Sequence, residues 1–413
     1  MVNQFAINLA FYMLMPYLAA HLSDDLGLAA WAVGLVLGVR NLSQQGMFLI
    51  GGTLADRYGY KAPILAGCLL RTAGFALLGW VDALPALIAA SAATGFAGAL
   101  FNPAVRAYLA TAAGDRRVDA FATFNVYYQA GMLLGPLVGL ALLAADFRLV
   151  CTVAAAVFAA LTVLQWRALP RAGGGGAGAD GPGGVLAQWR TVVANRPFLL
   201  FSVAMIGSYV LTFQVYLALP LAAGAALGAA GTEVTSALFV VSAAVAVAGQ
   251  LRLTGWAKRR WTAGQALVRG LTAMGLGFLP LAAVGFIGGG APAAPVALVA
   301  LLLAVVLLAA GSAVVYPFEM DTVVTLSGDR LVATHYGLYN TVSGLGITLG
   351  NLAVGALWDF ALRQDALWLV WCALTATGGV CAGAVLALAR SGRLAAPGLC
   401  EAVANAPMTR RFS

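Results

Sequence analysis

The chain has 413 residues, of which 62% are hydrophobic and 9% are charged. A soluble protein carries about a quarter of its residues as Asp, Glu, Lys or Arg, so this composition excludes a soluble enzyme, a nucleic-acid-binding module and a disordered chain. What remains is a protein that crosses the membrane many times. Its apolar runs are long and uncharged and do not alternate over segments of about ten residues, which predicts a helical bundle rather than a barrel.

Twelve apolar stretches are long enough for a helix to cross the hydrocarbon, which takes about 20 residues. In chain order they cover residues 2–22, 30–52, 62–80, 84–112, 118–144, 147–168, 197–223, 233–253, 263–288, 295–325, 331–358 and 366–389. The expected fold is therefore an all-α polytopic membrane protein with twelve transmembrane helices.

Basic residues gather on one side of this predicted bundle. They fall at the connections after every second span and in the tail, whereas aspartates are enriched at the other connections. Because cytoplasmic loops carry the excess of Lys and Arg, both termini are predicted to be cytoplasmic. The net charge of +8 then reflects topology, and we expect no nucleic-acid partner.

The chain repeats itself on either side of a low-complexity segment, RAGGGGAGADGPGG, at residues 171–184. Residues 102–116 align without a gap onto residues 316–330 and share a proline and a Gly-Asp-Arg string. Two symmetric six-helix halves are typical of secondary transporters. The predicted organisation is an N-terminal six-helix bundle (1–168), a Gly-rich cytoplasmic linker (169–194), a C-terminal six-helix bundle (195–390) and a cytoplasmic tail (391–413).

The connection between the second and third spans reads GTLADRYGYK over residues 52–61. A carboxylate beside two cations can form a compact ionic latch, and Asp56 can also lie against the N-terminal end of a helix from the other half, where negative charge is favoured. His335, at the start of the eleventh span, is expected to act as a cap or latch partner. The predicted latch consists of Gly52, Asp56, Arg57, Gly59, Lys61 and His335.

The fifth span contains Gly131, Gly135, Pro136 and Gly139. Three glycines at a spacing of four make a groove for close helix contact, and the proline removes a backbone donor. The glycines also extend the repeat, because a further shift of one residue aligns the first two of them with Gly346 and Gly350.

Both strings resemble motifs of the major facilitator superfamily. Residues 52–61 resemble its G-x-L-x-D-R-x-G-R-K signature, with Tyr60 where arginine is usual, and the glycines of the fifth span resemble the G-x-x-x-G-P-x-x-G-G motif of its drug:proton antiporters, with Leu140 at the last position. The R-x-x-Q-G pattern of the fourth span is broken, because Ser91 and Thr94 replace its arginine and glutamine. The resemblance implies a major facilitator fold that works by alternating access, but the coupling chemistry of the fourth span does not carry over.

Few ionisable residues lie at membrane depth, where each is a functional candidate because its burial is costly. The resemblance implies that spans one, four, seven and ten line the cavity, which singles out Arg106, Glu319 and Asp321. A carboxylate in low dielectric can exchange protons near neutral pH. The two acidic residues lie about 200° apart around a helix, so only one can face the cavity. A salt-bridge cluster that closes the inner gate is the alternative role for them.

A substrate cavity needs polar and aromatic groups among aliphatic ones. The predicted candidates, which suit an amphipathic, aromatic or cationic organic ligand, are Gln4, Asn8, Tyr12, Tyr127, Tyr209, Phe213, Tyr216, Tyr339 and Asn340.

The predicted function is proton-coupled efflux of small amphipathic or drug-like compounds across a bacterial inner membrane. The alternatives are a symporter or facilitator for an endogenous metabolite, siderophore or lipid-linked precursor, and a non-transporting membrane receptor. We expect a monomer in the lipid bilayer that binds a small-molecule substrate, with the proton gradient as driving force. No cofactor and no metal site are expected.

Overall fold

The computed structural model describes residues 1–170, 184–287 and 294–394, and within these ranges it contains helices and no strand. The α-helices are α1 (Val2–Ala20), α2 (Ala30–Tyr58), α3 (Lys61–Trp80), α4 (Leu84–Ala113), α5 (Arg117–Leu143), α6 (Phe147–Ala168), α7 (Val185–Ala194), α8 (Arg196–Ala204), α9 (Ile206–Phe213), α10 (Ala218–Leu227), α11 (Gly231–Arg260), α12 (Ala263–Leu276), α13 (Leu279–Ile287), α14 (Ala294–Ser327), α15 (Val332–Arg363) and α16 (Trp368–Arg390). Short π or 3₁₀ turns are η1 (His21–Asp25), η2 (Gly114–Arg116), η3 (Gln214–Tyr216) and η4 (Gly228–Ala230).

The prediction of twelve spans is confirmed. Ten segments of the described chain are long and apolar enough to cross a membrane, and one of them, Leu84–Leu143, contains both α4 and α5. Helix α2 has the length but carries more polar residues. The predicted seventh span is a broken helix made of α8, α9, η3 and α10, and the ninth is divided into α12 and α13.

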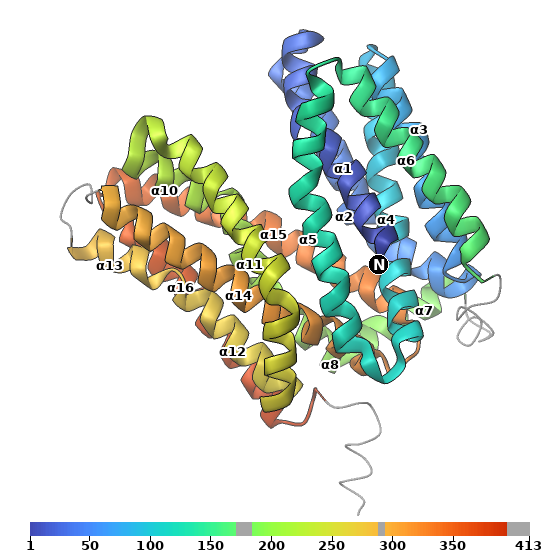
Figure 1. Ribbon diagram of the computed structural model, residues 1–413. Coiled ribbons are helices and arrows are strands. Elements are labelled where there is room, and N and C mark those ends of the chain that lie inside the picture. The colour runs from blue at the N-terminus through green and yellow to red at the C-terminus, as the bar shows by residue number, and fades with distance from the viewer. Residues whose placement is uncertain (171–183, 288–293, 395–413) are drawn as a thin grey trace, which may run out of the picture.

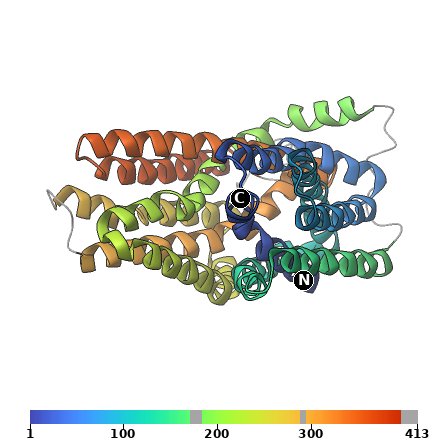
Figure 2. The same cartoon turned by 90° about the horizontal axis from the view of Figure 1, so that it is seen from above.

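The helices form two groups. Helices α1–α6 pack on one another and make the N-terminal half, and helices α8–α16 pack likewise and make the C-terminal half. The halves meet where α2 and α4 contact α15 and where α5 contacts α11 and α14. In Figure 1 they converge near α8 and the lower end of α5 and diverge towards α10, and Figure 2 shows them side by side from above.

Glycines bring α5 into close contact with α1. A Cβ atom on Gly139 would lie 2.0 Å from the carbonyl oxygen of Met13, and one on Gly135 would lie 2.7 Å from the Cβ of Tyr12. The repeat places equivalent glycines in the other half, where Gly346 and Gly350 of α15 pack against Ile206 and Val210 of α9. In both halves the fifth helix therefore packs on the first through its glycines, as small residues allow in membranes.

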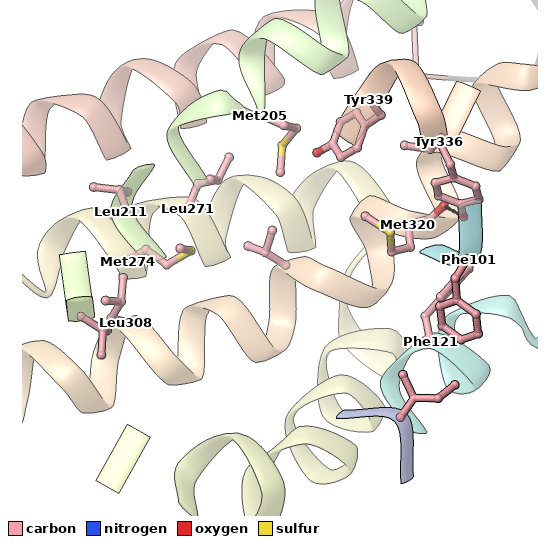
Figure 3. Packing of buried hydrophobic residues seen from close by; sticks show 14 of the residues in the cluster. Phe101, Phe121, Met205, Leu211, Leu271, Met274, Leu308, Met320, Tyr336 and Tyr339 are labelled. Carbon is pink, nitrogen blue, oxygen red and sulfur yellow. Dashed lines mark hydrogen bonds between the residues drawn. The ribbon is translucent and has the colours of Figure 1, made fainter. Parts of the chain in front are cut away.

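Buried apolar side chains fill both halves and part of the boundary between them. Within the C-terminal half, Leu211 of α9, Leu271 of α12 and Leu308 of α14 lie together (Figure 3). Across the boundary, the rings of Phe121 on α5 and Tyr336 on α15 are 6.3 Å apart, edge to face. Apolar packing thus supports the contact of the two halves beside α5.

Seven cations lie at the end of the molecule that contains the α2–α3, α4–α5 and α11–α12 connections: Arg57, Lys61, Arg116, Arg117, Lys258, Arg259 and Arg260. We call this end the basic end. Gly59 ends α2 there with a φ of 80°, a conformation that glycine adopts without strain. The α11–α12 connection uses a capping box, in which Thr262 and Gln265 accept each other's backbone N–H. This arrangement satisfies two otherwise free donors.

The predicted linker of 169–194 is more ordered at its end than its composition suggested. Residues 185–194 form α7, and Trp189 Nε1 donates a 2.8 Å hydrogen bond to Thr53 Oγ1 on α2. The helix is amphipathic and buries Gln188 and Val192, so packing rather than composition decides its structure. The Gly-rich residues 171–183 and the tail from 395 onwards lie outside the described residues.

Candidate transport cavity and latch

A cavity of about 240 Å³ lies between the two halves. Helices α1, α4 and α5 line it from the N-terminal half, and α9, η3, α11, α12 and α14 line it from the C-terminal half. Its wall is rich in tyrosine and carries two charged residues, Arg106 and Glu319. Such a mixture of aromatic surface and few polar groups is typical of a site for a small organic ligand.

Glu319 is deeply buried, with 3% of its surface exposed, in the last third of α14. The hydroxyl of Tyr339 on α15 donates to its Oε1, and the hydroxyl of Tyr209 on α9 also hydrogen-bonds to it. These hydroxyls satisfy a carboxylate that would otherwise be costly to bury. A carboxyl group held in this way beside an open cavity has the chemistry to bind and release a proton.

Arg106 lies on α4, on the other side of the same cavity. One guanidinium nitrogen donates to Asn340 Oδ1 at 3.2 Å, and the group also hydrogen-bonds to the hydroxyl of Tyr316. It interacts electrostatically with Glu319 but does not come within 4.0 Å of it as an ion pair. Its described hydrogen-bond partners are therefore neutral, and its Nε has none.

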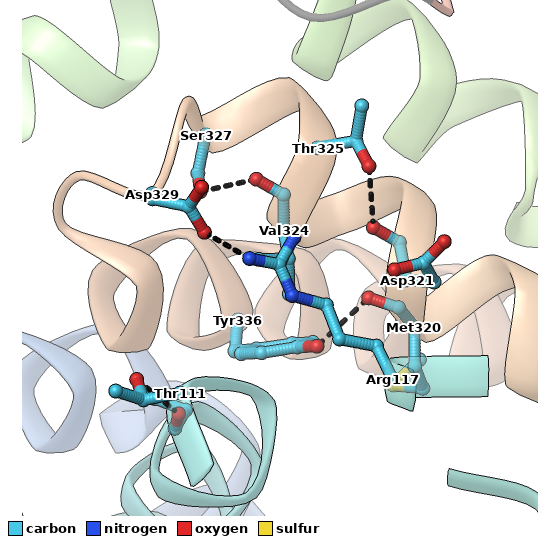
Figure 4. A network of polar contacts seen from close by, with 10 residues as sticks. Thr111, Arg117, Met320, Asp321, Val324, Thr325, Ser327, Asp329 and Tyr336 are labelled. Carbon is cyan, nitrogen blue, oxygen red and sulfur yellow. Dashed lines mark hydrogen bonds and ion pairs between the residues drawn. The ribbon is translucent and has the colours of Figure 1, made fainter. Parts of the chain in front are cut away.

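Asp321 faces away from this cavity, as the helical angle between it and Glu319 requires. It lies near Arg117 at the basic end, where Arg117 forms an ion pair of 2.6 Å with Asp329 (Figure 4). The structure thus separates the two acidic residues of α14: Glu319 lines the cavity and Asp321 belongs to a charged cluster.

Two ion pairs join the halves at the basic end. Besides Arg117 with Asp329, Lys258 at the end of α11 contacts Asp119 at the start of α5, with a nitrogen–oxygen distance of 2.6 Å. These pairs are partly exposed to solvent, so each contributes about 0–1 kcal/mol. They mark the basic end as the closed side of the cavity.

A buried amide pair lies between the cavity and these ion pairs. Asn125 of α5, which lines the cavity, donates to Gln250 Oε1 of α11 at 2.7 Å. Gln250 in turn donates to the backbone oxygen of Ala313 on α14 at 2.6 Å. This chain of hydrogen bonds joins the halves through buried groups, where such bonds are electrostatically stronger than at the surface.

Asp56 is the residue of the predicted latch that joins the halves. It accepts hydrogen bonds from the backbone N–H of Ala333 (3.1 Å) and of Thr334 (2.7 Å) and from the Thr334 hydroxyl (2.7 Å). These donors form the first turn of α15, where a negative charge is stabilised. The neighbouring Gly52 allows the approach, because a Cβ there would lie 2.1 Å from the Ala333 oxygen.

The expected ionic contacts of Asp56 are not formed among the described residues. Lys61 instead donates to the backbone oxygens of Trp166 and Leu169, at the end of α6, where a cation satisfies free carbonyl groups. Arg57 is exposed and lies over the ring of Tyr58. Of the two contacts predicted for Asp56, the structure contains the one between the carboxylate and a helix N-terminus of the other half.

His335 is close to this latch but is not its partner. Its Nδ1 lies 2.8 Å from the backbone oxygen of Leu331, its Nε2 lies 3.4 Å from Asn195 Nδ2, and its ring contacts Phe198 edge to face. The residue therefore ties the start of α15 to the start of α8, both within the C-terminal half.

Four of the predicted cavity residues line the cavity: Tyr12, Tyr209, Phe213 and Tyr216. Five do not: Gln4, Asn8, Tyr127, Tyr339 and Asn340. Gln4 lines a separate pocket of about 140 Å³ inside the N-terminal half, and Asn8 donates to its backbone oxygen at 2.8 Å. Tyr339 and Asn340 are instead behind the wall, bonded to its two charged residues.

Three residues of the cavity wall are absent from the sequence prediction: Tyr316, Asn125 and Tyr128. Tyr316 lies three residues before Glu319, a spacing that places both on one helix face, so this signal was present. Asn125 and Tyr128 are also three residues apart and share a face of α5. The hydroxyl of Tyr128 lies 3.3 Å from that of Tyr12. No sequence feature singled out Gln250 on α11.

Together, the fold and the cavity define a multi-pass helical membrane protein with two related halves around a central site. The model of the Major Facilitator Superfamily matches residues 1–351, and the chain belongs to this family. It is therefore a membrane transporter and not an enzyme, and the resemblance found in its two motifs is confirmed.

Relatives of known sequence or structure agree with this assignment. An uncharacterized MFS-type transporter of Mycobacterium tuberculosis, Rv0849, is 55% identical over 92% of this chain and 89% of its own. The multidrug resistance protein MdtH of Yersinia pestis is 29% identical over 88% of this chain and 87% of its own. The crystal structure of the human organic anion transporter MFSD10 has a TM-score of 0.66 at 15% identity, covers 92% of this chain and 97% of that one, and indicates the shared fold alone.

Proposed function

We propose that this chain is a proton-coupled secondary active transporter that exports small amphipathic organic compounds by alternating access. The observation that carries the proposal is Glu319, which is the one carboxylate among the described residues that line the cavity. A single titratable group at the substrate site lets proton binding and substrate binding influence each other. Tyr12, Phe213 and Tyr216 supply the aromatic surface for the organic part of the ligand.

The proposed cycle alternates between two arrangements of the halves. The described one is closed at the basic end by Asp56 and by two ion pairs. If the basic end faces the cytoplasm of a bacterial cell, as the distribution of Lys and Arg favours, this arrangement opens outwards. Breaking the Asp56 contacts to Thr334 and closing the opposite end would then expose the cavity to the cytoplasm.

Export is supported by the glycine motif of α5 and by the relative named as a multidrug resistance protein. A second candidate is symport of a compound and a proton in one direction. It is favoured by Arg106, a cavity cation that has no carboxylate partner, because an acidic metabolite and a proton would neutralise the two charged residues of the wall together.

A cellular accumulation assay tests the proposal. Cells that lack their own exporters would receive either the wild-type chain or Glu319→Gln and be loaded with one cationic, one neutral and one anionic amphipathic fluorophore. We expect wild-type cells to retain several-fold less of at least one fluorophore than the variant cells, and a protonophore to remove the difference.

Equal retention of every fluorophore in the two strains would contradict export. Higher retention in wild-type cells, sensitive to the protonophore, would instead establish the symport candidate. Asp321→Asn serves as the matched control, since it removes a carboxylate from the same helix outside the cavity, and it should behave like the wild type.

A further inference from the structure

The charged residues in the middle of the N-terminal half are all cations. They are Arg40 on α2, Arg71 on α3 and Arg106 on α4, while the aspartates of this half lie near helix ends or in connections. None of the three forms an ion pair: within the described ranges the ion pairs are His21–Asp25, Arg117–Asp329 and Lys258–Asp119. Each of the three guanidinium groups also has a buried Nε without a hydrogen-bond partner.

Two of these cations lie behind the cavity wall. The guanidinium carbon of Arg71 is 4.6 Å from the ring centroid of Phe11, and that of Arg40 is 5.5 Å from the same centroid. Arg71 is 5% exposed, whereas Arg40 is half-buried and donates a hydrogen bond to Asn41 Oδ1. Both interact electrostatically with Tyr12, which lines the cavity.

The third cation, Arg106, lines the cavity itself. Its described partners are the neutral groups of Asn340 and Tyr316, and the nearby carboxylate of Glu319 is occupied by two tyrosine hydroxyls. The cavity thus has three guanidinium groups in or behind its wall and one carboxylate. Buried charges are normally paired, and neither Arg71 nor Arg106 has an ion-pair partner among the described residues, so the surplus of positive charge calls for an anion.

We propose that the transported compound carries an anionic group of the carboxylate type, which binds to Arg106 in the central cavity. The planar guanidinium matches a carboxylate through two parallel hydrogen bonds. Arg40 and Arg71 add a positive field from behind Tyr12, and the aromatic residues hold the apolar part. The inference rests on the proposed transport function but not on its direction.

The anion and the proton on Glu319 would assist each other. A charged Glu319 competes with the ligand for the field of Arg106, whereas a protonated one does not; the other groups that face it, Tyr209, Tyr339 and Tyr316, remain neutral hydroxyls. The anion should therefore bind more tightly at lower pH, and the reverse effect on proton binding follows from linkage. This coupling is that of a symporter, so the inference favours the second candidate function.

Three probes with one aromatic body test the inference: 1-naphthoate, 1-naphthylmethanol and 1-naphthylmethylammonium. Calorimetric titration of the purified full chain should show naphthoate binding about ten-fold more tightly than the ammonium compound, since a charge-assisted hydrogen bond corresponds to about a factor of ten or more. The Arg106→Gln variant should lose this preference. Arg106→Lys should keep part of it, which separates loss of charge from loss of fold.

Arg269→Gln is the control, because Arg269 stacks on Trp261 and does not line the cavity, and it should keep the preference. Equal or tighter binding of the ammonium probe by the wild type, or a preference that survives in Arg106→Gln, would overturn the inference. If liposomes show no proton-driven flux while the naphthoate preference persists and depends on Arg106, the proposed proton coupling fails and this inference stands.

Discussion

At the scale of single residues, two buried carboxylates are stabilised in different ways and so suit different tasks. Asp56 lies on the N-terminus of α15 and accepts bonds from Ala333 and Thr334. Glu319 receives hydroxyl groups of Tyr209 and Tyr339. Backbone amides favour a carboxyl group that stays negatively charged, as a latch requires. Hydroxyl groups can donate to a carboxylate or accept from a carboxylic acid, so they can stabilise both states of a group that binds and releases a proton.

The Asp56→Asn substitution tests the latch. The neutral amide loses the charge that the N-terminus of α15 stabilises, at a cost of about 1–3 kcal/mol to the arrangement closed at the basic end. We expect the initial rate of transport to fall at least several-fold while the melting temperature of the purified protein changes little. Asp82→Asn, an exposed aspartate between α3 and α4, is the matched control and should transport normally; full activity of Asp56→Asn would contradict the latch role.

The residue scale also shows a limit of sequence reasoning. Helical geometry predicts that Glu319 and Asp321 face different surroundings, and the structure confirms it. The sequence could not decide which one faces the cavity, because residue spacing fixes the angle between two side chains and not the rotation of α14 in the bundle. Only the packing of Tyr209 and Tyr339 around Glu319 settles that rotation.

At the scale of helices, packing depends on small residues where two backbones approach. The glycines of α5 remove the side chains that would hold it away from α1. The pattern of spacing four was visible in the sequence, and so was its echo in Gly346 and Gly350. The helix that these glycines contact could not be predicted, because the contact with α1 depends on the three-dimensional order of the helices.

Two glycine-to-alanine substitutions test this packing. In Gly139→Ala the new Cβ would lie 2.0 Å from the Met13 oxygen, so the helices must move apart, at a cost of about 1–3 kcal/mol. Gly38→Ala on α2 meets nothing within 4 Å and gains about 1 kcal/mol of helix propensity. Thermal unfolding in detergent should give a lower melting temperature for the first and an unchanged or higher one for the second. Equal melting temperatures would refute the role of Gly139.

The sequence also did not predict the breaks within the seventh and ninth spans. The seventh span divides into α8, α9, η3 and α10, although its apolar pattern is continuous. Membrane helices tolerate such breaks where neighbouring protein or a cavity satisfies the backbone. Here the broken part carries Tyr209, Phe213 and Tyr216, which line the cavity, so the interruption lies where a substrate site is expected in transporters.

At the scale of the whole molecule, the described arrangement joins the halves firmly at one end. The contacts of Asp56 with α15, the Asn125–Gln250 bond and the two ion pairs all lie between the cavity and the basic end or at that end. Each of these contacts is polar and can be broken and remade without exposing a large apolar core. An interface built in this way suits a molecule whose halves rock about a central site.

The central claim is that Glu319 couples this movement to protons. Its most direct test is transport in proteoliposomes of the purified chain with an imposed pH gradient, using a fluorophore that the cells transport. We predict that the gradient drives substrate flux with a matching proton flux in the wild type and in Asp321→Asn. In Glu319→Gln the gradient should drive neither, while exchange of substrate without a gradient persists. Gradient-driven flux at the wild-type rate in Glu319→Gln would contradict the account.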